Sequence, residues 1–270
     1  MKKIALVCDG GHFPYGAFGL VKRIHENSPL FVTGIFLHGT QFDQYGILPD
    51  PAYSHAHASV LDVNAAATER TVARFTAECG GHHIPYSVHS HKEDMVFDPA
   101  IESRFSDLMV FSAGSFYKNM DETQPNIYTR NLLHAAECPV IAAPEEVPDI
   151  KKIVLLYDGN GPSAFAIKQF MYLFPEWCAL ETKLLYFGNG EQIPLAENLQ
   201  ELLQLHFPKL SIVPLPKGSS KTVLHELEHE TDTLIVCGSY GKHLVPAAFR
   251  KSFIAGLLQR HRLPVFIAHT

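Results

Sequence analysis

The feature that most constrains the fold is an internal repeat, because two consecutive segments contain the same order of apolar runs and helical patterns. Each segment opens with a lysine, a short apolar run and an aspartate: KIALVCD at residues 3–9 and KIVLLYD at residues 152–158. The ends of the segments also match, since CPVIAA at 138–143 aligns with LPVFIA at 263–268. Such a repeat predicts two copies of one arrangement of strands and helices.

Within each repeat, apolar runs alternate with segments of helical periodicity, which predicts five strands joined by helices. Strands that are apolar throughout need helices on both faces, and this favours parallel sheets. The predicted fold class is therefore α/β, with two tandem doubly wound parallel five-stranded sheets of the Rossmann-like kind. The proline-bounded segment 144–148 reads as a linker, so we predict domains at 1–146 and 147–270.

The predicted elements follow the same order in both repeats. Strands are expected at 3–9, 30–38, 84–89, 107–112 and 139–143, and again at 152–158, 181–187, 210–215, 233–237 and 264–268. Helices are expected at 15–26, 63–79, 98–106 and 127–137, and again at 163–173, around 195–206, at 221–230 and at 252–261. Residues 39–62, with two prolines, are expected to form a loop.

The amino-acid composition indicates which binding partners are excluded and in which cellular compartment the protein is expected. The 270 residues carry a formal charge of −6, which argues against binding to nucleic acid or to an anionic membrane. No apolar stretch is long enough to span a bilayer. The five cysteines include no CxxC pair and mostly lie in apolar runs, which is typical of reduced thiols in a core. A cytoplasmic protein is therefore expected.

The segment 232–252 contains the candidate binding site. An apolar strand ends there in Gly238-Ser239-Tyr240-Gly241, and a helix is expected to start at Ser252. Glycines at this spacing let backbone N–H groups point into one concavity, and a helix start adds free N–H groups, so an anion such as phosphate suits the place. Alternatively, the glycines only turn the chain and Ser252 only caps the helix.

These features together resemble the universal stress protein family in its tandem, two-domain form. The resemblance rests on the aspartates that close the first strands (Asp9 and Asp158), on an aspartate before the fourth strands at 107–111 and 232–236, and on the proline-led last strands. It covers nearly the whole chain. It implies an adenine nucleotide alpha hydrolase-like fold, and in nucleotide-binding members the motif G-x-x-G, nine residues, then G-S or G-T holds the phosphates of ATP.

Transferred to this sequence, the motif implies a cofactor-binding set of Asp158, Gly238, Gly241, Lys251 and Ser252. Gly238 and Gly241 match the first glycines and Ser252 matches the hydroxyl residue, whereas Lys251 replaces the third glycine. Its stem could obstruct the phosphate, or its ammonium could bind it as a point charge. The resemblance implies that Asp158 contacts the nucleoside. The sequence around Asp158 leaves two roles open, because this aspartate could contact a nucleoside or could cap the following helix.

The first repeat departs further from the motif. Ala113 and Phe116 stand where Gly238 and Gly241 stand in the second repeat, and Ile127 stands in place of the hydroxyl residue. We predict no ordinary phosphate site there, and Asp9 is expected to cap the following helix.

Histidine-rich segments offer a second chemistry. His225 to His229 match the metallohydrolase pattern H-E-x-x-H, but a helical wheel places both histidines towards solvent, opposite Val223 and Leu227. Further histidines lie in the 39–62 loop and around the third strand, namely His55, His57, His82, His83, His89 and His91. We assign no metal ligand and no catalytic residue among them.

The leading hypothesis is a cytoplasmic stress-response protein whose second domain binds an adenine nucleotide, ATP or AMP with Mg²⁺, as a regulatory ligand. The alternative is an interaction or scaffold protein that works through dimer surfaces without a nucleotide. A slow nucleotide hydrolase or a metal-dependent enzyme is a third possibility, against which the lack of an evident base near 238–252 counts. The two fifth strands are expected to pack together, and the whole chain is expected to form a homodimer.

Overall fold

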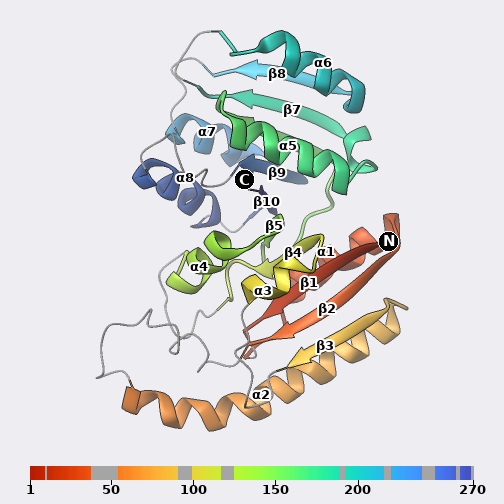
Figure 1. Ribbon diagram of the computed structural model, residues 1–270, viewed down its shortest axis with the longest axis vertical. Helices are drawn as coiled ribbons and strands as arrows, with labels where there is room; N and C mark the ends of the chain where they lie inside the picture. The colour runs from red at the N-terminus through yellow and green to blue at the C-terminus, as the bar shows by residue number, and fades with distance from the viewer. Residues whose placement is uncertain are drawn as a thin grey trace. The chain divides into compact units, whose positions relative to one another are not determined.

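The chain forms two units, and each contains parallel strands that alternate with helices along the sequence (Figure 1). The computed structural model describes residues 1–9, 11–37, 54–90, 99–116, 125–188, 192–215, 220–238, 247–259 and 262–268. Within these ranges, only the backbone is described for residues 54–65, 90, 99–100, 127–128, 220 and 247–252. Unit 1 comprises Met1–Cys138 and unit 2 comprises Pro139–Thr270.

Unit 1 contains a parallel sheet in the order β3-β2-β1-β4. Its elements are β1 (Lys2–Cys8), α1 (Tyr15–Asn27), β2 (Leu30–Phe36), α2 (Ser54–Gly81), β3 (Tyr86–Ser90), α3 (Pro99–Arg104), β4 (Leu108–Ser112) and α4 (Ile127–Ala135). The first strand therefore lies between the second and the fourth, so the strand order reverses beside it.

Unit 2 repeats this order as β10-β9-β6-β7-β8 and adds β5 beside β10. Its elements are β5 (Val140–Ala143), β6 (Lys152–Tyr157), α5 (Gly161–Leu173), η3 (Trp177–Ala179), β7 (Glu181–Tyr186), α6 (Ala196–His206), β8 (Leu210–Pro214), α7 (Ser220–Glu226), η4 (Leu227–His229), β9 (Thr233–Gly238), α8 (Ala247–Gln259) and β10 (Val265–Ala268). All pairs are parallel except β5 with β10, which is antiparallel.

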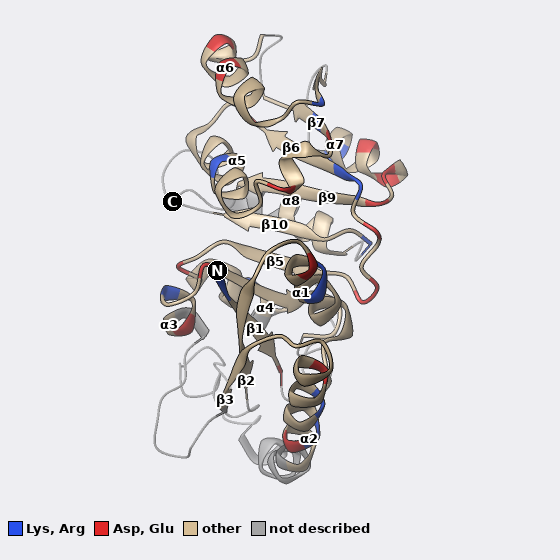
Figure 2. Ribbon diagram, turned by 90° about the vertical axis from the view of Figure 1, so that its right-hand side faces the viewer, with Lys and Arg blue, Asp and Glu red and all other residues tan. Residues whose placement is uncertain are grey.

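The predicted α/β class and the alternation of strands and helices are confirmed. The strands β1, β2, β4, β5, β6, β9 and β10 are buried almost throughout, whereas β3 and β8 are partly exposed. Figure 2 shows most charged residues on helices and near strand ends, with the strands nearly free of charge. The two fifth strands pair with each other, Val140 opposite Ile267 and Ala142 opposite Val265. The contacts thus place β5 in unit 2, whereas the sequence placed it before a boundary at 146/147, and that domain division stays a prediction.

Three predicted helices differ from those observed. α2 begins at Ser54, so part of the segment expected as a loop is helical. α8 begins at Ala247, five residues before the predicted start at Ser252. Leu195, Leu199 and Leu203 are spaced four residues apart along the helix predicted around 195–206. Leu199 and Leu203 are buried on α6, whereas Leu195 precedes the helix in a left-handed conformation and is 74% exposed.

The face of unit 2 that carries α5 has an aromatic core. Phe266 of β10 contacts Phe170 of α5 and Phe174, the C-cap residue of this helix, with ring centroids 5.6 and 6.1 Å away. Phe174 stacks on Trp177 at 4.6 Å and 11°. Because side chains alternate along a strand, Val265 and Ile267 point to the opposite face, which α7 and α8 cover.

No described helix has both the length and the apolar character needed to cross a bilayer.

We expect Phe174→Ala to destabilise unit 2 by about 3–5 kcal/mol, because it leaves a cavity among Phe170, Trp177 and Phe266. Urea unfolding followed by fluorescence of Trp177, the single tryptophan, measures this loss. The matched control on the same helix is Tyr172→Ala, which removes a side chain that is 63% exposed and should change stability by less than about 0.5 kcal/mol. Equal losses in the two variants would contradict this packing.

The five cysteines are free thiols, and four of them are buried. Burial raises the pKa of Cys79, Cys138, Cys178 and Cys237 to about 12, and it raises that of Cys8 as well. At pH 8 a thiol with such a pKa is almost entirely protonated, and the thiolate is the reactive form.

Iodoacetamide at pH 8 should therefore label the native chain slowly, with Cys138, which is half-buried, reacting before the others. In urea all five thiols should react at the rate of free cysteine, and mass spectrometry of the labelled peptides reads out each site. Fast labelling of Cys8 or Cys237 in the native chain would contradict the burial of β1 and β9.

Candidate functional site

The carboxyl ends of β6 and β9 meet at one edge of the unit 2 sheet. The two strands are parallel neighbours and pair in register from Lys152 opposite Thr233 to Leu155 opposite Val236. From β6 the chain continues to β7 on one side, and from β9 it continues to β10 on the other, so the strand order reverses here. Ligands of doubly wound sheets bind at such a point. The structure brings Asp158 and Gly238 to this edge.

Asp158, the residue after β6, organises the turn into α5. Its Oδ1 accepts the backbone N–H of Asn160 at 3.0 Å, and its Oδ2 accepts the side-chain amide of Asn160 at 3.1 Å. The hydroxyl of Ser163 lies 2.8 Å from Oδ1 of Asp158 and 2.8 Å from the carbonyl of Asn160, and its single proton serves one acceptor at a time. Asp158 thus supports the residue that precedes α5 rather than the helix N–H groups beyond it.

The carboxylate of Asp158 keeps one acceptor position for another donor. A carboxylate offers about four lone-pair positions. Among the described residues, Oδ1 accepts from Asn160 and Ser163, whereas Oδ2 accepts from Asn160 alone. Asp158 itself is half-buried.

Asp9, the equivalent residue of unit 1, holds the turn after β1. Its Oδ1 accepts the backbone N–H groups of Gly11 at 3.0 Å and His12 at 3.2 Å. Helix α1 begins later, after Pro14, and no side chain caps it. The expectation that Asp9 caps the helix is therefore wrong: the turn residues intervene, and the aspartate satisfies their donors instead.

Gly238 allows the end of β9 to approach the first turn of α5. A Cβ at this position would lie 2.6 Å from the carbonyl carbon and oxygen of Pro162 and 2.7 Å from the nitrogen of Ser163. These contacts are with backbone, which cannot rotate away. Gly238 is therefore a packing requirement, and the same contact sets it beside the Ser163 hydroxyl that serves Asp158.

Two tyrosines that the sequence analysis did not single out line the same edge. Tyr157 and Tyr186 are the last residues of β6 and β7, lie opposite each other, and are almost fully buried with ring centroids 6.1 Å apart. The Tyr186 hydroxyl donates to the carbonyl of Gln192 at 3.2 Å. Burial, together with the charge of Asp158, raises the pKa of Tyr157, so its hydroxyl stays protonated. Both strands end in the residues LLY, and this repeated ending is the feature of the sequence that could have indicated the two tyrosines.

The other predicted site residues are only partly placed. Gly241 lies outside the described residues. Lys251 and Ser252 belong to α8, but their side chains are outside the described part. Because α8 starts at Ala247, Ser252 lies in its second turn, where a backbone N–H bonds to the carbonyl four residues earlier. Ser252 thus does not cap this helix, and its role in binding stays a prediction.

The corresponding region of unit 1 is packed with side chains. Phe116 is 3% exposed, and its ring lies 5.4 Å from that of Phe111. Asn126 donates to the carbonyl of Phe116 at 2.6 Å and caps α4 by accepting the N–H of Thr129 at 2.8 Å. Ala113 is buried as well. The side chain of Ile127 is outside the described part.

The histidines described here do not form a metal centre. His225 and His229 are exposed, as the helical wheel predicts, with rings 5.9 Å apart, and His225 contacts Glu228 at 3.1 Å. His89 pairs with Glu102 at 3.0 Å. Within the described ranges no three His, Cys, Asp or Glu side chains are arranged to hold a metal ion. His91 and the side chains of His55 and His57 lie outside these ranges.

Comparison with known proteins gives a match at the level of structure. No family model and no curated protein matches the sequence. A universal stress protein from Archaeoglobus fulgidus DSM 4304 has a TM-score of 0.66 at 14% identity, over 99% of this chain and 96% of that chain. This chain has the universal stress protein fold. A provisionally named universal stress protein from Pseudomonas aeruginosa UCBPP-PA14 gives 0.56 at 13% identity, over 100% of this chain and 93% of its own.

A functionally unknown protein from Pseudomonas aeruginosa PAO1 matches equally well, with a TM-score of 0.56 at 13% identity over 100% of this chain and 92% of that chain. In each case nearly the full length of both chains is covered, so the universal stress protein fold extends over both repeats. The resemblance in the sequence is thereby confirmed for the fold.

We expect Gly238→Ala to lower the free energy of unfolding of unit 2 by about 1–3 kcal/mol, because its methyl group would overlap the backbone of α5. The matched control is Gly19→Ala in α1, where nothing lies within 4 Å of the added methyl group. That variant should be neutral or more stable by up to about 1 kcal/mol. Urea denaturation of both variants checks the pair, and equal stability would show that β9 and α5 do not touch at Gly238.

Proposed function

We propose that the chain is a cytoplasmic stress-response protein of the universal stress protein family that binds an adenine nucleotide, ATP or AMP with Mg²⁺, at the carboxyl edge of unit 2. The nucleotide acts as a regulatory ligand. The observation that carries the proposal is an acceptor position on Oδ2 of Asp158 that no described residue fills, at the edge where β6 pairs with β9 and the strand order reverses. A ribose hydroxyl is a donor suited to that position.

In this proposal the phosphates lie near the segment between β9 and α8. Backbone N–H groups of Gly238 and Gly241 donate to them, with the Ser252 hydroxyl and the Lys251 ammonium as further ligands. Mg²⁺ binds through phosphate oxygens and water rather than through a cluster of carboxylates, as it commonly does with nucleotides. Tyr157 and Tyr186 form the apolar wall behind Asp158.

A second candidate is an interaction protein that acts through dimer surfaces without a nucleotide. The start of α8 at Ala247 favours it, because Ser252 then lies inside the helix and its N–H group is not free for a phosphate. The packed region around Phe116 in unit 1 points the same way. In this case the chain works as a homodimer, and its binding surface is to be sought outside the carboxyl edge.

Calorimetric titration of the full chain with ATP and AMP in the presence of Mg²⁺ distinguishes the two functions. We expect binding in the micromolar range. Gly241→Trp should abolish binding by filling the phosphate region. Ser115→Trp, in the corresponding turn of unit 1, is the matched control and should leave binding unchanged. Absence of heat with the wild-type chain would reject the nucleotide and leave the interaction protein.

Lys251→Gly separates the two roles open to this lysine. If the ammonium binds phosphate, the variant should bind ATP about tenfold more weakly than the wild type. If the stem is an obstruction, the variant binds more tightly. Lys168→Gly removes an exposed lysine of α5 and is the matched control. It shows how much the loss of one positive charge and the low helix propensity of glycine change binding by themselves.

A further inference from the structure

A cavity of unit 2 lies away from the carboxyl edge, beneath α7, η4 and α8. Its volume is about 420 Å³, within the range of small-molecule sites. Its lining includes Glu230, Arg262 and Leu263, which precede β9 and β10, and also Ile235 and Val265, which lie opposite each other near the start of these strands. The candidate nucleotide edge, at Gly238, is at the other end of β9.

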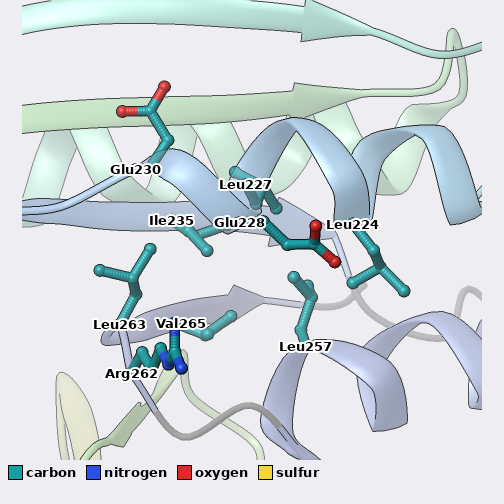
Figure 3. A pocket seen from close by; sticks show the side chains of 9 residues that line it. All are labelled: Leu224, Leu227, Glu228, Glu230, Ile235, Leu257, Arg262, Leu263 and Val265. Atoms are coloured by element: carbon teal, nitrogen blue, oxygen red, sulfur yellow. The ribbon is translucent and has the colours of Figure 1, made fainter.

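The lining of this cavity is mostly aliphatic. Gly256 of α8 lets α7 come close above the cavity, since a Cβ there would lie 2.8 Å from Cδ1 of Leu224. Figure 3 shows the aliphatic side chains converging on the space between the helices and the sheet. They are Leu224, Leu227, Ile235, Leu257, Leu263 and Val265.

Three charged residues complete the lining, and two of them form ion pairs within the described part of the chain. Glu230 contacts Lys183 at 2.6 Å, and in Figure 3 its carboxylate points away from the other lining side chains. Glu228 contacts His225 at 3.1 Å. Arg262 makes no ion pair or hydrogen bond within the described part of the chain, and Figure 3 places it beside Leu263 and Val265.

We propose that this cavity binds a small amphipathic monocarboxylate, such as a medium-chain fatty acid. The aliphatic lining takes up the apolar body, and the guanidinium of Arg262 holds the carboxylate. A guanidinium matches a carboxylate with two parallel N–H donors, and its charge here has no acid to neutralise it among the described residues. Glu228 lies beside Leu224 and Leu257 in Figure 3, apart from Arg262, so it does not occupy the place of the ligand's acid group.

The apolar contribution is tested by chain length. Calorimetric titration of the full chain with hexanoate, octanoate and decanoate should give one site, with affinity rising about fourfold for each added methylene as the chain fills the cavity. Leu224→Trp, which replaces a half-buried lining residue with a larger one, should weaken decanoate binding at least tenfold. Circular dichroism and the urea midpoint establish that this variant is folded.

The charge contribution is tested at Arg262, which is exposed and therefore replaceable without loss of packing. Arg262→Gln should weaken octanoate at least tenfold and leave 1-octanol unchanged, whereas Arg262→Lys should retain part of the octanoate affinity. Lys209→Gln, an exposed cation of unit 2 outside the lining, is the matched control.

Absence of octanoate and decanoate binding, or affinity that is independent of Leu224 and Arg262, would overturn the proposal. Sedimentation of the same samples adds a further test. If the chain self-associates and Leu224→Trp abolishes association while decanoate does not bind, the cavity is a contact between copies and the proposal fails. Titration of the Arg262→Gln variant with ATP should give the same affinity as the wild type. A failure of the carboxylate proposal is thereby distinguished from a failure of the proposed nucleotide site.

Discussion

The contact on which the carboxyl edge of unit 2 depends is the close approach of β9 to the first turn of α5. At Gly238 the strand meets the backbone of Pro162 and Ser163 with no side chain between them. This closeness holds Ser163 where its hydroxyl reaches Asp158, and Asp158 in turn fixes Asn160 at the start of the helix. One absent side chain therefore sets the geometry of the strand end, the turn and the helix start together.

The two repeats use the same turn chemistry after the first strand but have different residues after the fourth strand. Asp9 and Asp158 both accept the N–H two residues later, at 3.0 Å in each case. After the fourth strand, however, unit 1 places a phenylalanine, Phe116, where unit 2 has Gly241, and its carbonyl is tied to the Asn126 cap of α4. The first-strand aspartate alone is thus compatible with either outcome. In unit 1 the residues after the fourth strand are packed against the following segment, since Phe116 is buried and its carbonyl accepts from Asn126.

The sequence predicted the strands far better than the helix starts, for a physical reason. Buried parallel strands are apolar at every position, so runs such as LIVC at 234–237 are visible without knowledge of their neighbours. Where a helix starts depends on local donors and packing: Ser252 has the character of a cap, yet α8 starts at Ala247. Leu195 fits the leucine stripe of α6 but precedes the helix with φ 52° and is exposed.

The residues of the candidate site also divide into those that the sequence predicts and those that depend on contacts between distant segments. Asp158 and Gly238 could be predicted because an aspartate after an apolar run, and a glycine at the end of a strand, are recognisable from the sequence alone. That they lie at the same edge depends on the pairing of β6 with β9, which strand order alone did not establish. Ser163 and Tyr186 escaped notice because their contribution depends on contacts with residues of other segments, Asp158 and Tyr157 among them.

The two ends of β9 differ in chemistry because different kinds of group meet there. At its carboxyl end the strand meets the backbone of Pro162 and Ser163, and the neighbouring strand β6 ends there before Asp158. At its amino end the carbonyl of Asp232 accepts the N–H groups of Lys151 and Lys152 at 2.7 and 3.1 Å, which satisfies the backbone there. What remains near that end, on the α7 and α8 face, is aliphatic surface with Arg262 beside it. A ligand for that end must therefore gain most of its affinity from apolar contact and its orientation from one charge.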